Sequence, residues 1–170
     1  NVNIGKGCQF WGKMYFRREP GSSIVVGKNC RFRSAVWSNL AGINRPCMIC
    51  TLRPFAKILI GEGSGMSGTV IGAAEYIEIG SNVICGANVT ITDTDWHHRH
   101  HIKRSLENQE PSQSAPVIIG SNVWLGLNVV VLKGVTIGHN TVIAANSVVT
   151  KDIPENAIAA GQPAKVVKYL

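Results

Sequence analysis

The chain has 170 residues, a formal net charge of +7 and a hydrophobic content of 45%, which suits one domain with a core large enough to fold unaided. No window approaches the length of about 18 consecutive apolar residues that a transmembrane helix needs, so membrane-spanning classes are excluded. The opening residues, NVNIGKG, lack the cationic start and apolar stretch of a secretory signal peptide.

The first third of the chain is strongly basic. Residues 1–57 carry ten Lys or Arg residues and one acidic residue, Glu19, whereas the remaining residues carry seven basic and nine acidic ones. A local positive field of this kind attracts anionic partners. Because the chain starts inside a repeating pattern and without Met, we expect that residues precede Asn1 in the natural protein.

Five cysteines are present, an odd number without a disulfide framework. Cys47 and Cys50 form a CxxC pair, but the second pair of ligands that a structural zinc site needs is not found nearby. We therefore expect free thiols in a reducing cytosol and a cytoplasmic protein.

A six-residue repeat occupies the last third of the chain. From residue 119 it reads IGSNVW, LGLNVV, VLKGVT, IGHNTV, IAANSV and VTKDIP, and earlier copies begin at residues 4, 26, 60, 79 and 85. A period of six fits neither a helix nor an alternating strand, but it fits a coil that bends every six residues. Three blocks then make one triangular coil of 18 residues, as in the spacing of Ile119 and Ile137.

Each position of the block has an expected place. The first residue points inward, the fifth fills the space beside it, and a small second residue permits the tight corner. Cys8 and Cys30 occupy fifth positions and Cys85 a first position, so all three are expected to be small core residues.

The repeat is interrupted before Ile119. Residues 97–118 are polar and contain Pro111 and Pro116, and an insertion in a solenoid must leave the stack as a loop. After Val149, Pro154 and Gly161 mark a second departure. We expect a solenoid over residues 1–153 with a protruding loop at about 97–118, and a short C-terminal arm of the same domain at 154–170.

The stretch ITDTDWHHRHH, residues 91–101, holds four of the five histidines. A metal cage, a solvated cluster and a single catalytic base are the three interpretations. Adjacent histidines on an extended strand point to opposite faces, which disfavours a cage, and we expect no metal. An imidazole with a pKa of about 6.5 is suited to accept a proton at neutral pH.

The blocks resemble those of the hexapeptide-repeat acyltransferases, most closely the galactoside and maltose O-acetyltransferase branch, over residues 58–168 and more loosely over 1–57. This resemblance implies an all-β fold, a left-handed parallel β-helix, in a homotrimer with active sites between subunits. It also implies an acetyl-CoA-dependent O-acetyltransferase whose acceptor is a hydroxyl of a sugar-containing molecule.

TDTDWH, residues 92–97, resembles the DxDxH-like segment of that family and implies that His97 is the general base, with His98 in reserve. Asp93 and Asp95 either orient the ring of His97 or only cap the turn. Trp96 either stacks on a sugar ring or pins the loop.

Further residues follow from the resemblance. Trp124, in NVWLG, is expected to line the acyl tunnel or the subunit contact, and Ser67, in GMSG, to touch the acceptor or the catalytic ring. The amide of Leu127 is expected to face the thioester carbonyl, although relatives often carry a small or hydroxyl residue there. The expected acetyl-CoA contacts are Leu127, Ala145, Thr150, Lys151, Lys165 and Lys168. For Lys165 and Lys168 an ordinary solvated charge is the alternative.

The basic first third leads us to expect an anionic acceptor, such as a nucleotide sugar, a lipid-phosphate-linked glycan or an acidic polysaccharide. A solvated surface or proximity to an anionic membrane is the alternative. Nucleic acid is not expected, because no recognised binding motif is present. A metal-dependent hydratase like the γ-carbonic anhydrases, an antibiotic acetyltransferase and a non-catalytic solenoid remain as rival functions.

Overall fold

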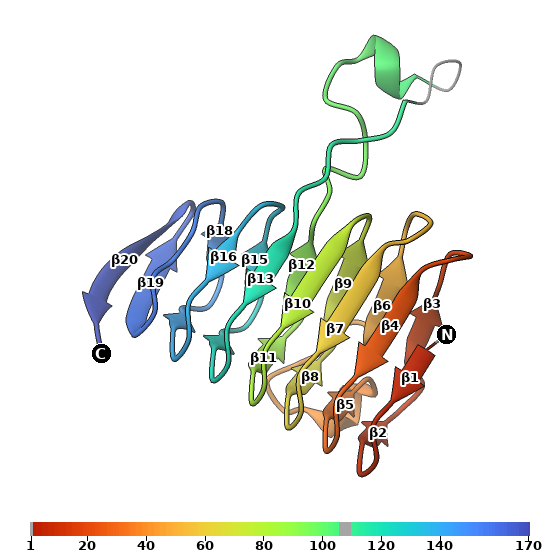
Figure 1. Ribbon diagram of the computed structural model, residues 1–170. Coiled ribbons are helices and arrows are strands. Elements are labelled where there is room, and N and C mark those ends of the chain that lie inside the picture. The colour runs from red at the N-terminus through yellow and green to blue at the C-terminus, as the bar shows by residue number, and fades with distance from the viewer. Residues whose placement is uncertain (1, 106–109) are drawn as a thin grey trace.

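Three sheets run the length of the molecule and form the faces of a triangular prism, seen side-on in Figure 1. This computed structural model describes residues 2–105 and 110–170. The first face contains β1 (Val2–Ile4), β4 (Ser23–Val26), β7 (Lys57–Ile60), β10 (Tyr76–Ile79), β13 (Val117–Ile119) and β16 (Thr136–Ile137). The second face contains β2 (Gln9–Trp11), β5 (Arg31–Arg33), β8 (Gly65–Ser67), β11 (Ile84–Ala87), β14 (Trp124–Leu125), β17 (Val142–Ile143), β19 (Ala157–Gly161) and β20 (Ala164–Tyr169). The third face contains β3 (Tyr15–Arg17), β6 (Met48–Thr51), β9 (Val70–Ala73), β12 (Thr90–Thr92), β15 (Val130–Val131) and β18 (Val148–Val149).

The predicted 18-residue coil is confirmed by the strand register. Ile119 pairs with Ile137, and the same spacing relates Leu125 to Ile143 and β15 to β18. The first residues of the blocks from 119 to 149 are at most 1% exposed, so they form one apolar ladder inside the prism. Fully burying a side chain of this size contributes roughly 1.5–3 kcal/mol, and the ladder therefore supplies most of the driving force for folding.

The cysteines follow the same rule. Cys30 and Cys85 are buried, and Cys8 is half-buried against the core, as expected of small inward residues. Burial raises the pKa of Cys85 to about 12 and that of Cys30 to about 11, which keeps both thiols protonated and inert.

The corners are made differently from the prediction. The left-handed conformation falls on the fourth residue of the block, for example Asn122 at φ 60° and Asn140 at φ 58°, and not on the glycine at the second position. A Cβ at Gly120 would instead lie 2.7 Å from the backbone nitrogen of His139 in the next coil. The glycine thus permits close stacking of coils, while asparagine, which tolerates this conformation, makes the turn.

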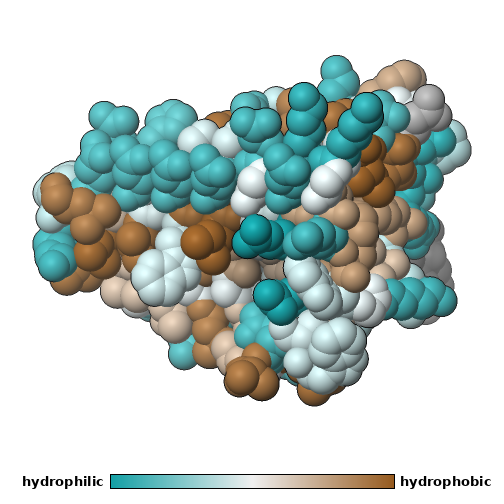
Figure 2. All heavy atoms as spheres, turned by 90° about the horizontal axis from the view of Figure 1, so that it is seen from below, coloured by the Kyte–Doolittle hydropathy of each residue, from teal (hydrophilic) through white to brown (hydrophobic). Residues whose placement is uncertain are grey.

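Asparagine also links the corners to one another. The Asn122 amide donates to Asn140 at 3.0 Å, and Asn140 donates to Asn156 at 2.9 Å. Viewed from below, hydrophilic residues form rows along the length of the prism (Figure 2). These side-chain ladders hold successive corners in register on the outside, as the apolar ladder does inside.

Two segments depart from the stack. Between β5 and β6 the chain passes through a short 3-10 helix, η1 (Val36–Ser38), and Arg45 holds this excursion by donating to the carbonyls of Gly68 and Asn88. Between β12 and β13 residues 93–105 and 110–116 project from the edge between the third and first faces and carry η2 (Ile102–Arg104) (Figure 1). The loop expected at 97–118 includes residues 106–109, which lie outside the described residues.

At its C-terminal end the prism continues with β19, which pairs in parallel with β17, and β20 then turns back antiparallel to β19. Over residues 2–105 and 110–170, no helix has both the length and the apolar character needed to cross a bilayer.

Ile137→Ala should lower the free energy of unfolding by about 2–5 kcal/mol, because it opens a cavity in the apolar ladder. Ile137 is 0% exposed, whereas its neighbour Thr136 is exposed on the same strand. Thr136→Ala is therefore the matched control, with an expected change within about 0.5 kcal/mol. Urea unfolding followed by circular dichroism measures both, and equal costs for the two variants would contradict the assignment of inward and outward positions.

Candidate active site in the protruding segment

The protruding segment, of which the structure describes residues 93–105 and 110–116, leaves the prism through a two-stranded neck. Thr94 and Ser114 form an isolated antiparallel bridge, and the amide of Asp95 donates to the carbonyl of Gln113 at 3.1 Å. The hydroxyls of Thr94 and Ser112 lie 2.7 Å apart across the neck. These contacts fix how the segment emerges, and therefore where the residues that follow Thr94 point.

A cleft of about 410 Å³ lies between the neck and the body of the prism. It contains two of the four clustered histidines, His97 and His98, together with two arginines, Arg53 and Arg104. Its lining residues are Leu52, Arg53, Ala74, Thr94, Trp96, His97, His98, Arg104, Glu110, Pro111 and Ser112.

A strained turn presents His97 to this cleft. The amide of His97 donates to the carbonyl of Asp95 at 2.7 Å, and Trp96 between them adopts φ 62°. Positive φ is unusual for a bulky residue and is retained only where the surroundings impose it. Here the Trp96 ring packs on Gly72, where a Cβ would lie 2.7 Å from Cζ2, so only glycine leaves room for the ring.

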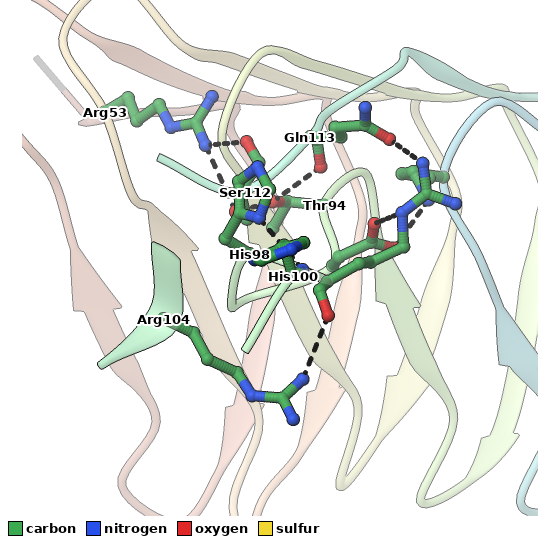
Figure 3. Close-up of polar contacts among 10 residues, drawn as sticks. Arg53, Thr94, His98, His100, Arg104, Ser112 and Gln113 are labelled. Atoms are coloured by element: carbon green, nitrogen blue, oxygen red, sulfur yellow. Dashed lines mark hydrogen bonds and ion pairs between the residues drawn. The ribbon is translucent and has the colours of Figure 1, made fainter. Parts of the chain in front are cut away.

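The two histidines in the cleft differ in what their rings contact. His98 is half-buried, and its Nδ1 accepts a hydrogen bond from the amide of His100 at 3.0 Å (Figure 3). In a neutral imidazole that acceptor nitrogen carries the lone pair and Nε2 carries the proton. His97 is exposed, and within the described residues its ring makes no hydrogen bond.

Asp93 is a turn cap. Its carboxylate is 0% exposed and accepts the amides of Ala74, Glu75 and Tyr76 at 2.6–2.8 Å. Burial raises the pKa of the Asp93 carboxyl above its ordinary value, while the three amide bonds act in the opposite direction. Both oxygens are occupied by the preceding coil, so of the two roles expected for Asp93 the structure has the turn-capping one.

Asp95 is engaged by two cations. Its Oδ1 lies 2.5 Å from Nζ of Lys133, and its Oδ2 lies 3.6 Å from Nε of Arg99. Asp95 therefore contacts His97 through its main-chain carbonyl, and its carboxylate ties the neck to the coil that carries Lys133.

Two residues of the site escaped the sequence analysis. Arg53, in the TLRPF stretch that begins at the end of β6, reaches from the prism to Ser112 of the neck (Figure 3), and it also donates to Ser114. Lys133 lies in the coil above Asp95. The partners of Arg53 are about 60 residues away in sequence, and no local motif announces such contacts.

The other predicted residues lie elsewhere on the prism. Trp124 is 53% exposed on the second face, where it pairs in register with Val142 of the next coil. Ser67 is buried on the same face, in β8. Leu127 and Ala145 occupy successive coils at the corner between the second and third faces. Within the described residues, the Leu127 amide donates no hydrogen bond.

The remaining four expected acetyl-CoA contacts are exposed near the C-terminal end of the chain. Thr150 and Lys151 follow β18, and Lys165 and Lys168 lie on β20, antiparallel to β19. His97 thus emerges at one corner of the prism, whereas Leu127 and Ala145 lie at another. One side of the prism spans six residues, or about 20 Å of extended chain. A single copy therefore does not bring its own His97 beside its own Leu127 corner.

No group of three or more His, Cys, Asp or Glu side chains placed to hold a metal ion occurs in the part of the chain that the structure describes.

Residues 116–151 match the family model for the hexapeptide repeat of succinyl-transferase. This part of the chain carries the hexapeptide repeat.

Two curated relatives of this hexapeptide-repeat protein are galactoside O-acetyltransferases. That of Escherichia coli strain K12 is 46% identical over 94 residues, which are 55% of this chain and 44% of the relative. That of Lactococcus lactis subsp. lactis is 34% identical over 147 residues, which are 85% of this chain and 62% of the relative. The chain thus spans about half the length of these relatives.

A solved structure shares the fold. The hexapeptide-repeat acetyltransferase VCA0836 of Vibrio cholerae, complexed with acetyl coenzyme A, superposes with a TM-score of 0.63 at 24% identity. The match covers 99% of this chain and 70% of that one. The left-handed parallel β-helix and the resemblance to hexapeptide-repeat acyltransferases, both expected from the sequence, are confirmed.

Asp93→Asn should lower the free energy of unfolding by roughly 2 kcal/mol, because one acceptor oxygen then faces three buried N–H donors. Asp152→Asn is the matched control, since exposed Asp152 accepts a single amide, that of Thr136, through an oxygen that asparagine keeps. Urea unfolding at neutral pH measures both. An Asp93→Asn protein of unchanged stability would contradict the turn-capping role.

Proposed function

We propose that this hexapeptide-repeat protein transfers the acetyl group of acetyl-CoA to a hydroxyl of a sugar-containing, anionic acceptor, with His97 as the general base. The observation that carries the proposal is the exposed imidazole of His97 in a polar cleft, held by a strained turn and free of intramolecular hydrogen bonds among the described residues. The names of the relatives, galactoside O-acetyltransferases, support a sugar hydroxyl as acceptor.

His97 is favoured over His98 by the state of its ring nitrogens. Nδ1 of His98 accepts from a main-chain amide, so its neutral ring carries the proton on Nε2 and offers no free lone pair. A general base needs a free lone pair within hydrogen-bond reach of the proton that it removes. His97 retains one, and the carbonyl of Asp95 fixes its main chain.

Acetyl-CoA supplies an activated acetyl group. In the proposed step His97 takes the proton of the acceptor hydroxyl while that oxygen attacks the thioester carbonyl carbon. The Leu127 amide donates to the carbonyl oxygen as negative charge develops there. The carbon–sulfur bond then breaks, and the His97 imidazolium returns its proton to the departing thiolate. The hydroxyl becomes an ester and free CoA leaves.

The division of residues between corners of the prism supports a homotrimer. His97 and the expected acetyl-CoA contacts at Leu127 and Ala145 lie at different corners of one copy. A neighbouring copy that presents its Leu127 corner to the cleft completes the site. We also propose Ala145, Thr150, Lys151, Lys165 and Lys168 as acetyl-CoA contacts, Trp124 and Ser67 as acceptor-side residues, and a cytoplasmic location, which the five free thiols support.

His97→Ala should lower kcat by about 10²- to 10⁴-fold with the KM for acetyl-CoA unchanged, because the base acts on the acceptor hydroxyl and not on the donor. A thiol-release assay with a panel of sugars and glycan intermediates measures both constants. His98→Ala is the matched control and should retain most of the turnover. Full activity of His97→Ala, or an equal loss in the two variants, would sink the assignment.

A further inference from the structure

A hollow on the second face lies apart from the His97 cleft. Gly65 of β8 occupies an outward position between Arg31 of β5 and Ile84 of β11, with which it pairs. Open space surrounds it, since a Cβ at Gly65 would meet no atom within 4 Å. A depression of about 360 Å³ lies at this position. It is lined by Arg31, Arg33, Gly63, Gly65, Met66, Ser67, Asn82, Ile84 and Cys85.

The hollow is cationic at one end. Arg31 and Arg33 are two residues apart on β5 and therefore project from the same side of the sheet. None of its lining residues is acidic, and none of the ion pairs formed within residues 2–105 and 110–170 involves either guanidinium. Two unneutralised guanidinium groups beside one depression favour a bound oxyanion, whose geometry they match.

Arg33 is held in place before any ligand arrives. Its guanidinium lies over the ring of Trp11, 4.5 Å from the centroid, and donates to the carbonyl of Ser38. Arg33 pairs in register with Ser67, a lining residue that is 7% exposed. A guanidinium ordered in advance loses less conformational entropy when it binds a ligand.

The opposite end of the hollow is apolar. Ile84, 57% exposed, pairs with Trp124, 53% exposed, so the outward row continues from Arg31 through the gap at Gly65 to two large apolar side chains. A pyranose ring with an acidic substituent has the matching shape. Its charged group would lie toward the arginines and its apolar face toward Ile84 and Trp124.

We infer that this hollow binds the carboxylate or phosphate group of an acceptor whose hydroxyl reaches His97 of a neighbouring copy, and that Arg31, Arg33 and the gap at Gly65 determine the preference for an anionic sugar. The identity of the ligand as an acceptor rests on the proposed function. The hollow itself rests on the geometry of β5, β8 and β11.

Binding, measured without catalysis, tests the site. Isothermal titration of the intact protein with a methyl pyranoside, the corresponding methyl uronide and the corresponding sugar phosphate should show about tenfold tighter binding of an acidic ligand than of the neutral one. The two acidic ligands distinguish carboxylate from phosphate. Raising the salt concentration should weaken the binding of the acidic ligand and leave the affinity for the neutral ligand unchanged.

Arg31→Gln should weaken the binding of the acidic ligand about tenfold and change the affinity for the neutral ligand by less than about twofold. Lys57→Gln is the matched control, because it removes the same charge from the basic first third but on β7 of the first face. Gly65→Val should also abolish the preference, because its side chain projects into the hollow between Arg31 and Ile84. Its melting temperature should stay near that of the parent, because the position is open and lies in a strand.

Three results would overturn the inference. They are equal binding of neutral and acidic ligands, equal losses in Arg31→Gln and Lys57→Gln, and undiminished binding by Gly65→Val. The outcomes also separate the two proposals. If the protein binds acidic sugars selectively but releases no CoA with any sugar, the anion-binding hollow is supported and the transferase function is contradicted. If a sugar releases CoA and neither Arg31→Gln nor Gly65→Val changes that release, the transferase function is supported and the role of the hollow is contradicted.

Discussion

Every feature of this molecule depends on one constraint, the vertical register of its coils. Each inward residue lies directly over its equivalent in the coil below, so the apolar ladder is continuous only if every coil, whatever its length, returns to the same inward positions. Additional chain is accommodated mainly at the corners, and a bulge in β11, where Cys85 and Ala87 pair with the successive residues Met66 and Ser67, takes up one more residue. Ile79 pairs with Ile119 and Ile119 with Ile137, so the coil that carries the protruding segment is 22 residues longer than the next one (40 against 18) and still stacks without a shift. A mobile surface would not hold His97 in a strained turn, whereas a rigid edge does.

The same constraint explains which parts of the fold the sequence predicts. Inward positions such as Leu125 and Val131 follow from the period of six, because every coil must place an apolar residue at the equivalent position in the core. The use of Asn122 rather than glycine for the corner conformation was not predicted. Spacing alone does not distinguish a residue that makes a turn from one that allows the next coil to approach. The excursion through η1 likewise depends on Arg45 bonding to carbonyls more than 20 residues away.

The candidate site was predictable in part for a similar reason. The histidine stretch stands out because it interrupts the repeat, and His97 lines the cleft beside it. The contacts that hold His97 in place could not be predicted from the sequence. Arg53 and Lys133 reach the neck from distant coils, and the carboxylate of Asp93 accepts hydrogen bonds from three amides of the preceding coil. Such contacts arise from stacking, which places residues that are remote in sequence one strand spacing apart. The gap at Gly65 is of the same kind, because only the register aligns it with Arg31 and Ile84.

The prism also separates what the proposed chemistry must combine. The proposed base emerges at one corner and the expected thioester contacts lie at another, so the proposed reaction requires two copies. Mixing His97→Ala subunits with Ala145→Glu subunits, each inactive alone, tests this most directly. After denaturation and random reassembly in equal amounts, three quarters of cyclic trimers contain both kinds of subunit, and each of these has one intact site in three. Thiol release should return to about a quarter of the parental rate if His97 of one copy serves the donor on its neighbour, whereas a mixture as inactive as its components would contradict a site shared between subunits.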